Sequence, residues 1–380
     1  MTARGFYVLL FGLALSLTAL SVSSPGAFLL GAAAIIALAL SLISVVLAAL
    51  SCRISQRIDV PTVSRGGLCR YTIRARMFAP LPIAPLQLSV LLPSGKRSEF
   101  LLPARLLGAT ESDNDFPCPH VGVYPVGAES IVISDCFGLF SLRRRLRQLP
   151  AALTVLPVPR KTRPVQYSPG EGETGASQRA QADRTTPEDT RLWQEGDELG
   201  RVHWKLSMRR QQLMVHTYET PQRPDALVIM DCAAPQTPDS RRAAVIDALT
   251  ETCAGVLKSL LDQSRITRLP LSGDAPQELS GSRPEQLAPM LQALAQERFV
   301  KTPDFARVLL LSARRMRRTG STVILTTHLT PGAAEAAIAL SRTGPHTRLT
   351  LVTAGEMTTE EQQLMHLLFS SGVETSHVRV

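Results

Sequence analysis

The sequence predicts a multi-domain protein with an N-terminal transmembrane α-hairpin, a small antiparallel β domain and a C-terminal α/β domain whose doubly wound sheet is mostly parallel. Three observations predict this order. An uncharged apolar run opens the chain, short extended segments separated by Pro and Gly follow, and strand and helix patterns alternate toward the end. A chain of 380 residues is long enough for two or three domains.

The apolar run predicts a two-helix hairpin over residues 1–53. It contains no charged residue between Gly5 and Cys52. The segment Ser23-Ser24-Pro25-Gly26 favours a turn and divides the run into halves at Phe6–Val22 and Ala27–Leu50. Each half has about the 17–25 residues that a helix needs to cross a bilayer.

Basic residues predict the orientation of this hairpin. Arg4 flanks the first half, Arg53 and Arg57 flank the second, and the connecting turn carries no charge. The positive-inside rule therefore predicts a multi-pass inner-membrane protein with cytoplasmic soluble domains. One alternative is a cleaved signal peptide, although the small-residue cleavage pattern is poor. A second alternative is that the two halves are buried helices of a soluble core.

Residues 54–156 predict the β domain, and residues 157–224 predict a linker. Pro and Gly recur between the extended segments, which is typical of a small antiparallel domain. We expect strands at Arg70–Phe78, Leu86–Leu92, Gly122–Val126 and Glu129–Ser134. The stretch from Leu156 to Thr186 is rich in Pro and Gly and predicts a loop or linker.

Residues 225–380 predict the α/β domain, because strands that alternate with helices form a mostly parallel sheet covered on both faces. The expected strands are Asp225–Met230, Arg265–Leu271, Thr322–Thr327 and Arg348–Thr353. The expected helices are Ser240–Leu261 with Asp239 as its cap, Glu285–Ala295, Asp304–Arg317, Ala333–Ser341 and Thr359–Phe369.

Charge and cysteine usage narrow the functional classes. The net charge of +9 could attract an anionic lipid or a nucleic acid. Its densest run, at residues 143–147, contains no aromatic residue for base stacking, so a solvated or lipid-facing edge is favoured over a nucleic-acid site. The six cysteines show no zinc-like spacing and indicate reduced thiols, and no pattern points to a metal or a cofactor.

Residues 189–205 form the densest cluster of polar and aromatic residues, and they contain both tryptophans of the chain. Gly196 can supply a sharp turn, and Asp197 is placed to cap a helix that runs to about Arg210. Leu199, Val202, Leu206 and Leu213 would share one face of this segment.

This cluster has two interpretations. Asp197 and His203 could form an acid/base pair, or Arg191, Arg201 and Lys205 could bind an anion. The structural interpretation is an ion-paired, Trp-anchored helix that fixes the linker to the α/β domain. We favour the structural one because neither a nucleophile nor a phosphate-binding loop accompanies the cluster.

Two segments resemble those of a known family. Glu195-Gly196-Asp197 followed by Arg201-Val202-His203-Trp204-Lys205, and then Leu213-Met214-Val215, closely resembles the signature of the bacterial domain of unknown function 58 family. Upstream, Asp135-Cys136-Phe137-Gly138-Leu139-Phe140 resembles that family's Asp-Pro-Phe-Gly-Leu-Phe segment, with Cys136 in place of Pro. With the paired N-terminal helices, the resemblance spans nearly the whole chain.

The resemblance implies a C-terminal domain similar to a von Willebrand factor type A domain. It also implies partners: a MoxR-type AAA+ ATPase and a transglutaminase-like membrane protein. The metal site of A-type domains is built on an Asp-x-Ser-x-Ser motif, which here reads Asp231-Cys232-Ala233-Ala234-Pro235. Both hydroxyls are missing, so we expect a degenerate site at Asp231 that binds no metal.

Three functions follow as hypotheses. The first is a membrane-anchored scaffold of unestablished activity that binds a partner protein as well as the lipid bilayer, and it is not an enzyme. The second is a hydrolase or transferase that uses Asp197 and His203. The third is an anionic-lipid or nucleic-acid binder that acts through the basic run at residues 143–147.

Overall fold

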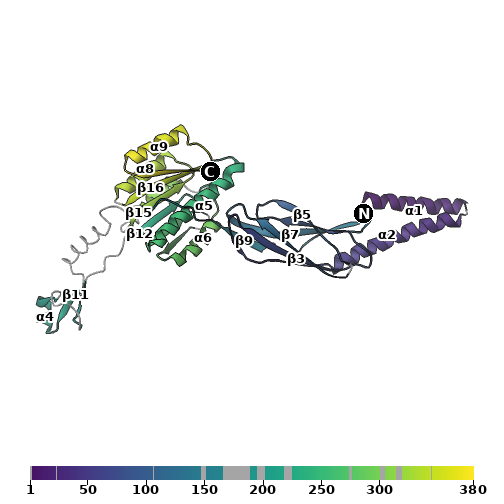
Figure 1. The fold of residues 1–380 in the computed structure, drawn as a ribbon, viewed down its shortest axis with the longest axis horizontal. Coiled ribbons are helices and arrows are strands. Elements are labelled where there is room, and N and C mark those ends of the chain that lie inside the picture. The colour runs from purple at the N-terminus through teal and green to yellow at the C-terminus, as the bar shows by residue number, and fades with distance from the viewer. Residues whose placement is uncertain are drawn as a thin grey trace. The chain divides into compact units, whose positions relative to one another are not determined.

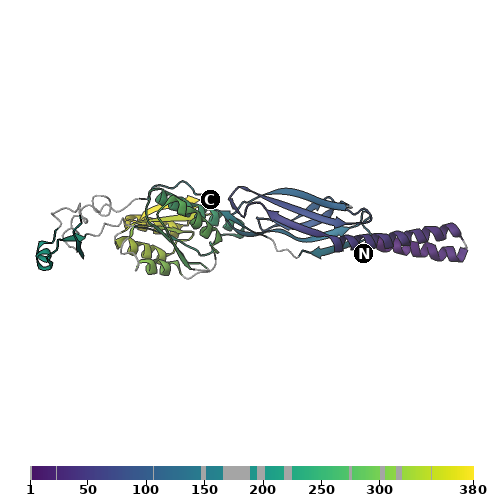
Figure 2. The same ribbon diagram turned by 90° about the horizontal axis from the view of Figure 1, so that it is seen from below.

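The computed structural model describes residues 2–22, 24–105, 107–146, 151–165, 189–194, 202–217, 225–273, 276–299, 304–313, 319–343 and 345–380. The chain divides into two compact units, Met1–Pro157 and Val158–Val380 (Figures 1 and 2). The first contains a helical hairpin and a β domain, and the second contains an α/β domain. Each unit is described by itself.

The hairpin consists of α1 (Ala3–Val22) and α2 (Pro25–Ser51), which run side by side (Figure 1). Both are long and apolar enough to cross a membrane. The turn is shorter than predicted, because Pro25 begins α2, where its missing N–H removes no helical hydrogen bond. The two helices approach closely at Gly31, where an added Cβ would lie 3.0 Å from the carbonyl O of Gly12.

The β domain contains two sheets. One has the order β1-β3-β6, and the other has the order β2-β9-β7-β4-β5, with β8 paired to β7. Every pair is antiparallel, as predicted, except the parallel pair β2–β9. The strands are β1 Arg53–Ile58, β2 Thr62–Ser64, β3 Leu68–Phe78, β4 Leu86–Leu91, β5 Arg97–Leu102, β6 Leu107–Pro117, β7 Gly122–Ser134, β8 Ser141–Arg145 and β9 Ala151–Leu156.

One strand corrects the sequence-based expectation. The segments predicted as separate strands around residues 122–126 and 129–134 form the single strand β7. Gly127 joins them with a φ of 149°, a conformation that suits glycine, and the β4–β7 register shifts between Ser89 and Val90 on the facing strand. A glycine inside an extended run therefore marked a bulge and not a turn.

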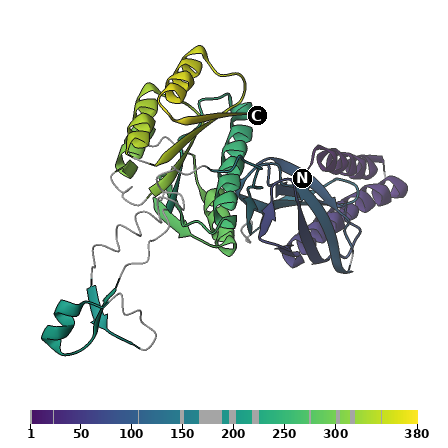
Figure 3. The same ribbon diagram turned by 60° about the vertical axis from the view of Figure 1, so that its left-hand side comes forward.

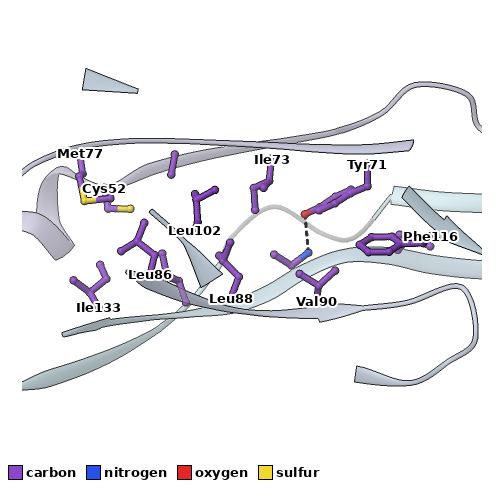
Figure 4. Packing of buried hydrophobic residues seen from close by; sticks show 14 of the residues in the cluster. Cys52, Tyr71, Ile73, Met77, Leu86, Leu88, Val90, Leu102, Phe116 and Ile133 are labelled. Carbon is purple, nitrogen blue, oxygen red and sulfur yellow. Dashed lines mark hydrogen bonds between the residues drawn. The ribbon is translucent and has the colours of Figure 1, made fainter. Parts of the chain in front are cut away.

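The core of the β domain lies between the facing sheets (Figure 4). Tyr71 is 1% exposed, and its hydroxyl donates to Gln56 Oε1 at 2.8 Å and accepts from the Ala128 N–H at 3.1 Å. Burial raises the pKa of Tyr71 to about 12. The phenol therefore stays protonated as a buried donor at physiological pH.

The last turns of α2 belong to this core. Val45, Ala48 and Ala49 are buried in the same cluster as the strands. Ser51 Oγ hydrogen bonds to the backbone of Phe78, with both contacts at 3.0 Å, and Ser44 Oγ bonds to the backbone of Leu81. The helix thus continues from the hairpin into the β domain without a flexible joint.

The turn at residues 135–140 holds the start of α1. The buried Asp135 carboxylate accepts the N–H groups of Phe137 and Phe140, and Gly138 completes the turn at a φ of 68°. Thr2 then binds this turn, because its hydroxyl donates to the carbonyls of Gly138 and Leu139. The two segments that flank the hairpin are therefore fixed to the β domain.

Two arginines of the basic run at residues 143–147 make hydrogen bonds within their own unit. Arg144 donates to the carbonyls of Ala49 and Cys52 at 2.7 and 3.1 Å and so caps the end of α2. Arg143 donates to Ser130 Oγ, whereas Arg145 is exposed. Residue 147 lies outside the described residues.

The α/β domain has a six-stranded sheet in the order β14-β13-β12-β15-β16-β17, with all pairs parallel except β13–β14. This arrangement confirms the predicted doubly wound sheet. Helices α5 and α6 pack on one face, and α7, α8 and α9 pack on the other (Figure 3). The elements are β12 Asp225–Met230, α5 Asp239–Asp262, β13 Thr267–Leu271, β14 Gln277–Gly281, α6 Leu287–Gln296, α7 Phe305–Ala313, β15 Thr319–Thr326, α8 Pro331–Arg342, β16 His346–Thr353, α9 Thr359–Ser370 and β17 Glu374–Arg379.

Pro238 corrects the predicted start of α5. Pro238 occupies the N-cap position, and Asp239 lies in the first turn, where it pairs with Arg242 at 2.9 Å. Asp239 therefore favours the helix through its charge near the N-terminus and not as a cap.

Residues 158–165, called the strap below, pack against the α/β domain, although the sequence predicted a linker there. The Arg160 N–H donates to the carbonyl of Glu251 on α5 at 3.1 Å, and Val165 is buried in the core beneath α5. Arg348 of β16 donates to the carbonyls of Arg163 and Pro164 at 2.9 and 2.7 Å. The strap thus forms part of the second unit.

Candidate functional site

The signature residues form a small module of two strands and one helix. Strand β10 (Asp189–Leu192) pairs antiparallel with β11 (Met214–Thr217), and α4 (Trp204–Arg210) lies between them in sequence. The Trp193 N–H donates to the Leu213 carbonyl, and the His203 N–H donates to the Met214 carbonyl, both at 2.8 Å. Residues 189–217 are thereby closed by backbone hydrogen bonds between their two ends.

Helix α4 begins later than predicted. Val202 forms a β-bridge with Val215, so the backbone before His203 is extended. His203 is the N-cap, and its ring Nδ1 accepts the Leu206 N–H at 3.2 Å. Gly196, Asp197 and Arg201 lie outside the described residues, so the predicted cap and the acid/base pair are not placed.

One face of α4 is apolar and exposed. Trp204 is 60% exposed and Met208 is 80% exposed, and the two lie four residues apart on the same face. Trp204 therefore does not anchor the helix, contrary to the structural interpretation. The module is held instead by buried Val202, Met214 and Val215, and by Ser207, whose hydroxyl accepts the Met214 N–H at 2.9 Å.

The predicted anion site is only partly placed. Lys205 is exposed on α4, together with Arg209 and Arg210 in its last turn. Arg191 lies in β10, but its side chain is outside the description. The helix thus presents cations next to an apolar face, and the grouping of Arg191 and Arg201 with Lys205 remains a prediction.

The second candidate is the edge of the α/β sheet where β12 and β15 end. Strand order reverses between these two strands, which is where ligands bind in doubly wound sheets. Asp231 follows β12 and is 5% exposed. Its carboxylate accepts the Ala233 N–H at 2.9 Å and the hydroxyl of Thr326, the last residue of β15, at 2.8 Å.

The residues at this edge do not fit a hard divalent cation. Both Asp231 oxygens already accept hydrogen bonds, and Ala233 and Pro235 occupy the two positions where hydroxyl ligands would be needed. Burial raises the pKa of Cys232 to about 12, so the thiol is neutral. Among the described residues, no group of three or more His, Cys, Asp or Glu side chains could hold a metal.

The substitution Asp231→Asn tests whether Asp231 is a buried structural residue at the end of β12 and not a metal ligand. Burial raises the pKa of Asp231, although the hydrogen bonds from Ala233 and Thr326 oppose the shift. A carboxyl with a raised folded-state pKa stabilises the fold at acid pH, and this contribution is lost as pH rises through that pKa. The amide avoids the desolvation of a charge, so the variant should be more stable than the wild type at neutral pH.

The measurement is the free energy of unfolding by denaturant as a function of pH. The gain of Asp231→Asn over the wild type should shrink as pH falls, because the wild-type carboxyl becomes neutral. Asp239→Asn, at an exposed position on α5, is the matched control and should show no gain. A variant at position 231 that is less stable than the wild type at every pH would contradict the assignment.

Sheet order and the helices on both faces define the class of the second unit as a doubly wound α/β domain, the fold expected of an A-like domain. Residues 189–358 match the sequence model of the family described as protein of unknown function DUF58. The matched region includes the signature module and most of the sheet. The upstream segment at residues 135–140 lies outside the matched region.

Solved structures show more distant likeness. The chain is similar to the VWA domain of SpRpn10, with 12% identity and a TM-score of 0.29, covering 41% of this chain and 88% of that chain. It is also similar to a von Willebrand factor type A protein from Catenulispora acidiphila, with 11% identity and a TM-score of 0.30, covering 44% of this chain and 40% of that one. These values are low, so the fold assignment rests on the sheet topology. No curated protein matches the chain.

Proposed function

We propose that this chain is a membrane-anchored scaffold without enzymatic activity, whose second unit binds a partner protein in the cytoplasm. The two apolar helices support the anchor. Arg4, Arg53 and Arg57 near the ends of the hairpin support the cytoplasmic orientation through the positive-inside rule. The continuous passage of α2 into the β domain supports a scaffold role, because it joins anchor and soluble domain rigidly.

The observation that carries the binding role is the exposed apolar face of α4, formed by Trp204 and Met208, in a module that also exposes Leu192 and Leu213. The exposed fractions are 60% for Trp204, 80% for Met208, 55% for Leu192 and 41% for Leu213. Exposed apolar side chains next to charged residues are typical of protein interaction surfaces, and Trp and Met are enriched there. Lys205 and Arg209 supply a basic rim, so an acidic partner surface is expected.

A MoxR-type AAA+ ATPase is the partner that the family resemblance favours, and a transglutaminase-like membrane protein is the second. The hydrolase or transferase hypothesis finds less support, because His203 already uses Nδ1 to cap α4. The nucleic-acid hypothesis is also weakened, since Arg143 and Arg144 bind groups within their own unit.

The test is affinity purification of the full chain from gently solubilised membranes. We expect the wild type to retain the ATPase. Removal of the second unit, residues 158–380, should abolish retention, and Trp204→Ala combined with Met208→Ala should reduce it about tenfold or more, as expected for interface anchors. Leu310→Ala combined with Leu311→Ala, at exposed positions on α7, is the matched control and should retain the partner.

His203→Asn separates the scaffold from the enzyme. Asparagine is a good N-cap, so α4 should remain intact while the imidazole is lost. Retention of the partner by this variant is expected. If neither the ATPase nor another protein is retained by the wild type, the scaffold proposal is wrong, and an activity lost in His203→Asn would favour the enzyme.

A further inference from the structure

A basic pocket lies where α2 enters the β domain. It has a volume of about 550 Å³ and is lined by Ser51, Arg53, Arg76, Met77, Phe78 and Gly108. Ser51 is the last residue of α2, and Phe78 is the last residue of β3. The pocket therefore combines the end of an apolar helix with two arginines and an aromatic ring.

The two arginines face each other. Arg53 on β1 and Arg76 on β3 are direct partners in the antiparallel register, and both are exposed. Like charges directly opposite each other destabilise a sheet. In the part of the chain that the structure describes, no carboxylate forms an ion pair with either guanidinium. An anion between them would remove this repulsion.

The carbonyl groups at the end of α2 do not bind the guanidinium groups of Arg53 and Arg76. Its terminal carbonyls at Ala49 and Cys52 already accept hydrogen bonds from Arg144. Arg53 and Arg76 therefore remain available to a ligand. Two guanidinium groups can bind one phosphate with several charge-assisted hydrogen bonds.

The length of α2 places the pocket at the lipid headgroups if the hairpin spans the membrane, and here the inference rests on the proposed function. A hydrocarbon core near 30 Å requires about 20 helical residues, which extend from Pro25 to about Ser44. The following seven residues add roughly 10 Å. Ser51 then lies near the outer limit of the headgroup region, within reach of long arginine side chains.

Exposed aromatic and aliphatic side chains lie at the same expected membrane depth as the pocket. Phe78 is 47% exposed at the pocket, and Leu81, beside Ser44, is 38% exposed. Phe137, in the turn that holds the start of α1, is 71% exposed. Exposed aromatic rings next to arginines are typical of the membrane–water interface.

We propose that Arg53 and Arg76 form a binding site for the phosphate of an anionic phospholipid headgroup. The phosphate lies between the two guanidinium groups, and Phe78 contacts the adjoining glycerol and acyl region. The lipid links the two strands that would otherwise repel each other at the exit of α2. The site is distinct from the basic run at residues 143–147.

The experiment uses the full chain purified in a neutral detergent. Phosphatidylglycerol, phosphatidylcholine and inorganic phosphate are each added, and binding is measured by native mass spectrometry and by the thermal unfolding midpoint. Wild type should bind phosphatidylglycerol and be stabilised by it, as expected when a ligand binds the folded state. The combined Arg53→Gln and Arg76→Gln variant should bind phosphatidylglycerol at least about tenfold more weakly than the wild type, and the lipid should no longer stabilise it.

The matched control combines Arg70→Gln with Arg97→Gln. It removes the same charge from exposed arginines of the same domain that already pair with Asp115 and Glu129. It should bind like the wild type. Equal losses in both variants, or unchanged binding in the Arg53 and Arg76 variant, would overturn the site. Inorganic phosphate that stabilises the protein as strongly as the lipid would identify a free-anion site and overturn the lipid assignment.

Alkaline carbonate extraction of membranes separates this inference from the proposed function. A wild-type chain that is released by carbonate refutes the membrane anchor itself. A chain that stays in the membrane while the arginine variants bind lipid normally refutes the lipid site alone.

Discussion

Gly255→Ala is expected to destabilise the second unit by about 2–3 kcal/mol, although glycine in a helix interior is normally less stable than alanine. Gly255 lies in α5 where the strap crosses, and an added Cβ would overlap the carbonyl O of Arg160. The Arg160 side chain also pairs with Glu251 at 3.0 Å, so the strap cannot move away without losing these contacts. Backbone atoms on the opposing side leave no flexible group to yield.

Hydrogen exchange and denaturant unfolding measure this effect. The amide of Arg160, which donates to the Glu251 carbonyl, should lose protection in Gly255→Ala. Gly332→Ala in α8 is the matched control, because its new Cβ meets Ala306 at an ordinary 3.5 Å, and its stability should be unchanged or slightly higher. A Gly255→Ala protein with wild-type stability and a protected Arg160 amide would show that the strap does not rest on α5.

Arg348→Leu is expected to cost about 3 kcal/mol, because it removes the buried partner of a partly buried ion pair. Arg348 is 4% exposed, pairs with Glu374 at 2.8 Å and donates to the carbonyls of Arg163 and Pro164. Leucine leaves the carboxylate of Glu374 without its cation and the two strap carbonyls without their donor. The strap should detach before the sheet unfolds, which limited proteolysis near residue 163 can detect.

A second substitution separates two contributions to this loss of stability, the unpaired carboxylate and the lost hydrogen bonds to the strap. Arg348→Leu combined with Glu374→Leu removes the unpaired carboxylate, so it should recover part of the stability while the strap remains detached. Arg379→Leu breaks an exposed pair with Glu356 on the same edge and should change stability by no more than about 0.5 kcal/mol. A full recovery in the double variant would mean that the hydrogen bonds to the strap contribute nothing.

The sheet strands show how far sequence patterns predict this fold. Strand β12 has the predicted bounds, since a continuous apolar run bounded by charged residues marks a strand buried on both faces. Strand β17 has the sequence Glu-Thr-Ser-His-Val-Arg and was missed, because an edge strand with polar side chains has no apolar periodicity. Strand β6 was missed for a related reason, as its Asp and Asn residues are typically depleted in strands.

In the candidate site, too, the sequence predicts some features and misses others. The signature pattern predicted a helix that ends at Arg210, and α4 does end there. The pattern could not predict that α4 exposes Trp204 and Met208, because burial depends on which residues from distant parts of the chain pack against a face. The strap was predicted as a linker for its Pro content, and only the contact with α5 shows otherwise.

By itself, the sequence determined the uncharged helical hairpin, the antiparallel β pattern and the alternating α/β pattern, since each depends on local periodicity and on the residues that interrupt it. Only the tertiary structure decided the roles of the arginines. Arg144 caps α2, Arg348 holds the strap, and Arg53 faces Arg76 across two strands. The physical reason is that a charge acts over distances in space, and strand pairing brings together charges that the sequence separates by tens of residues.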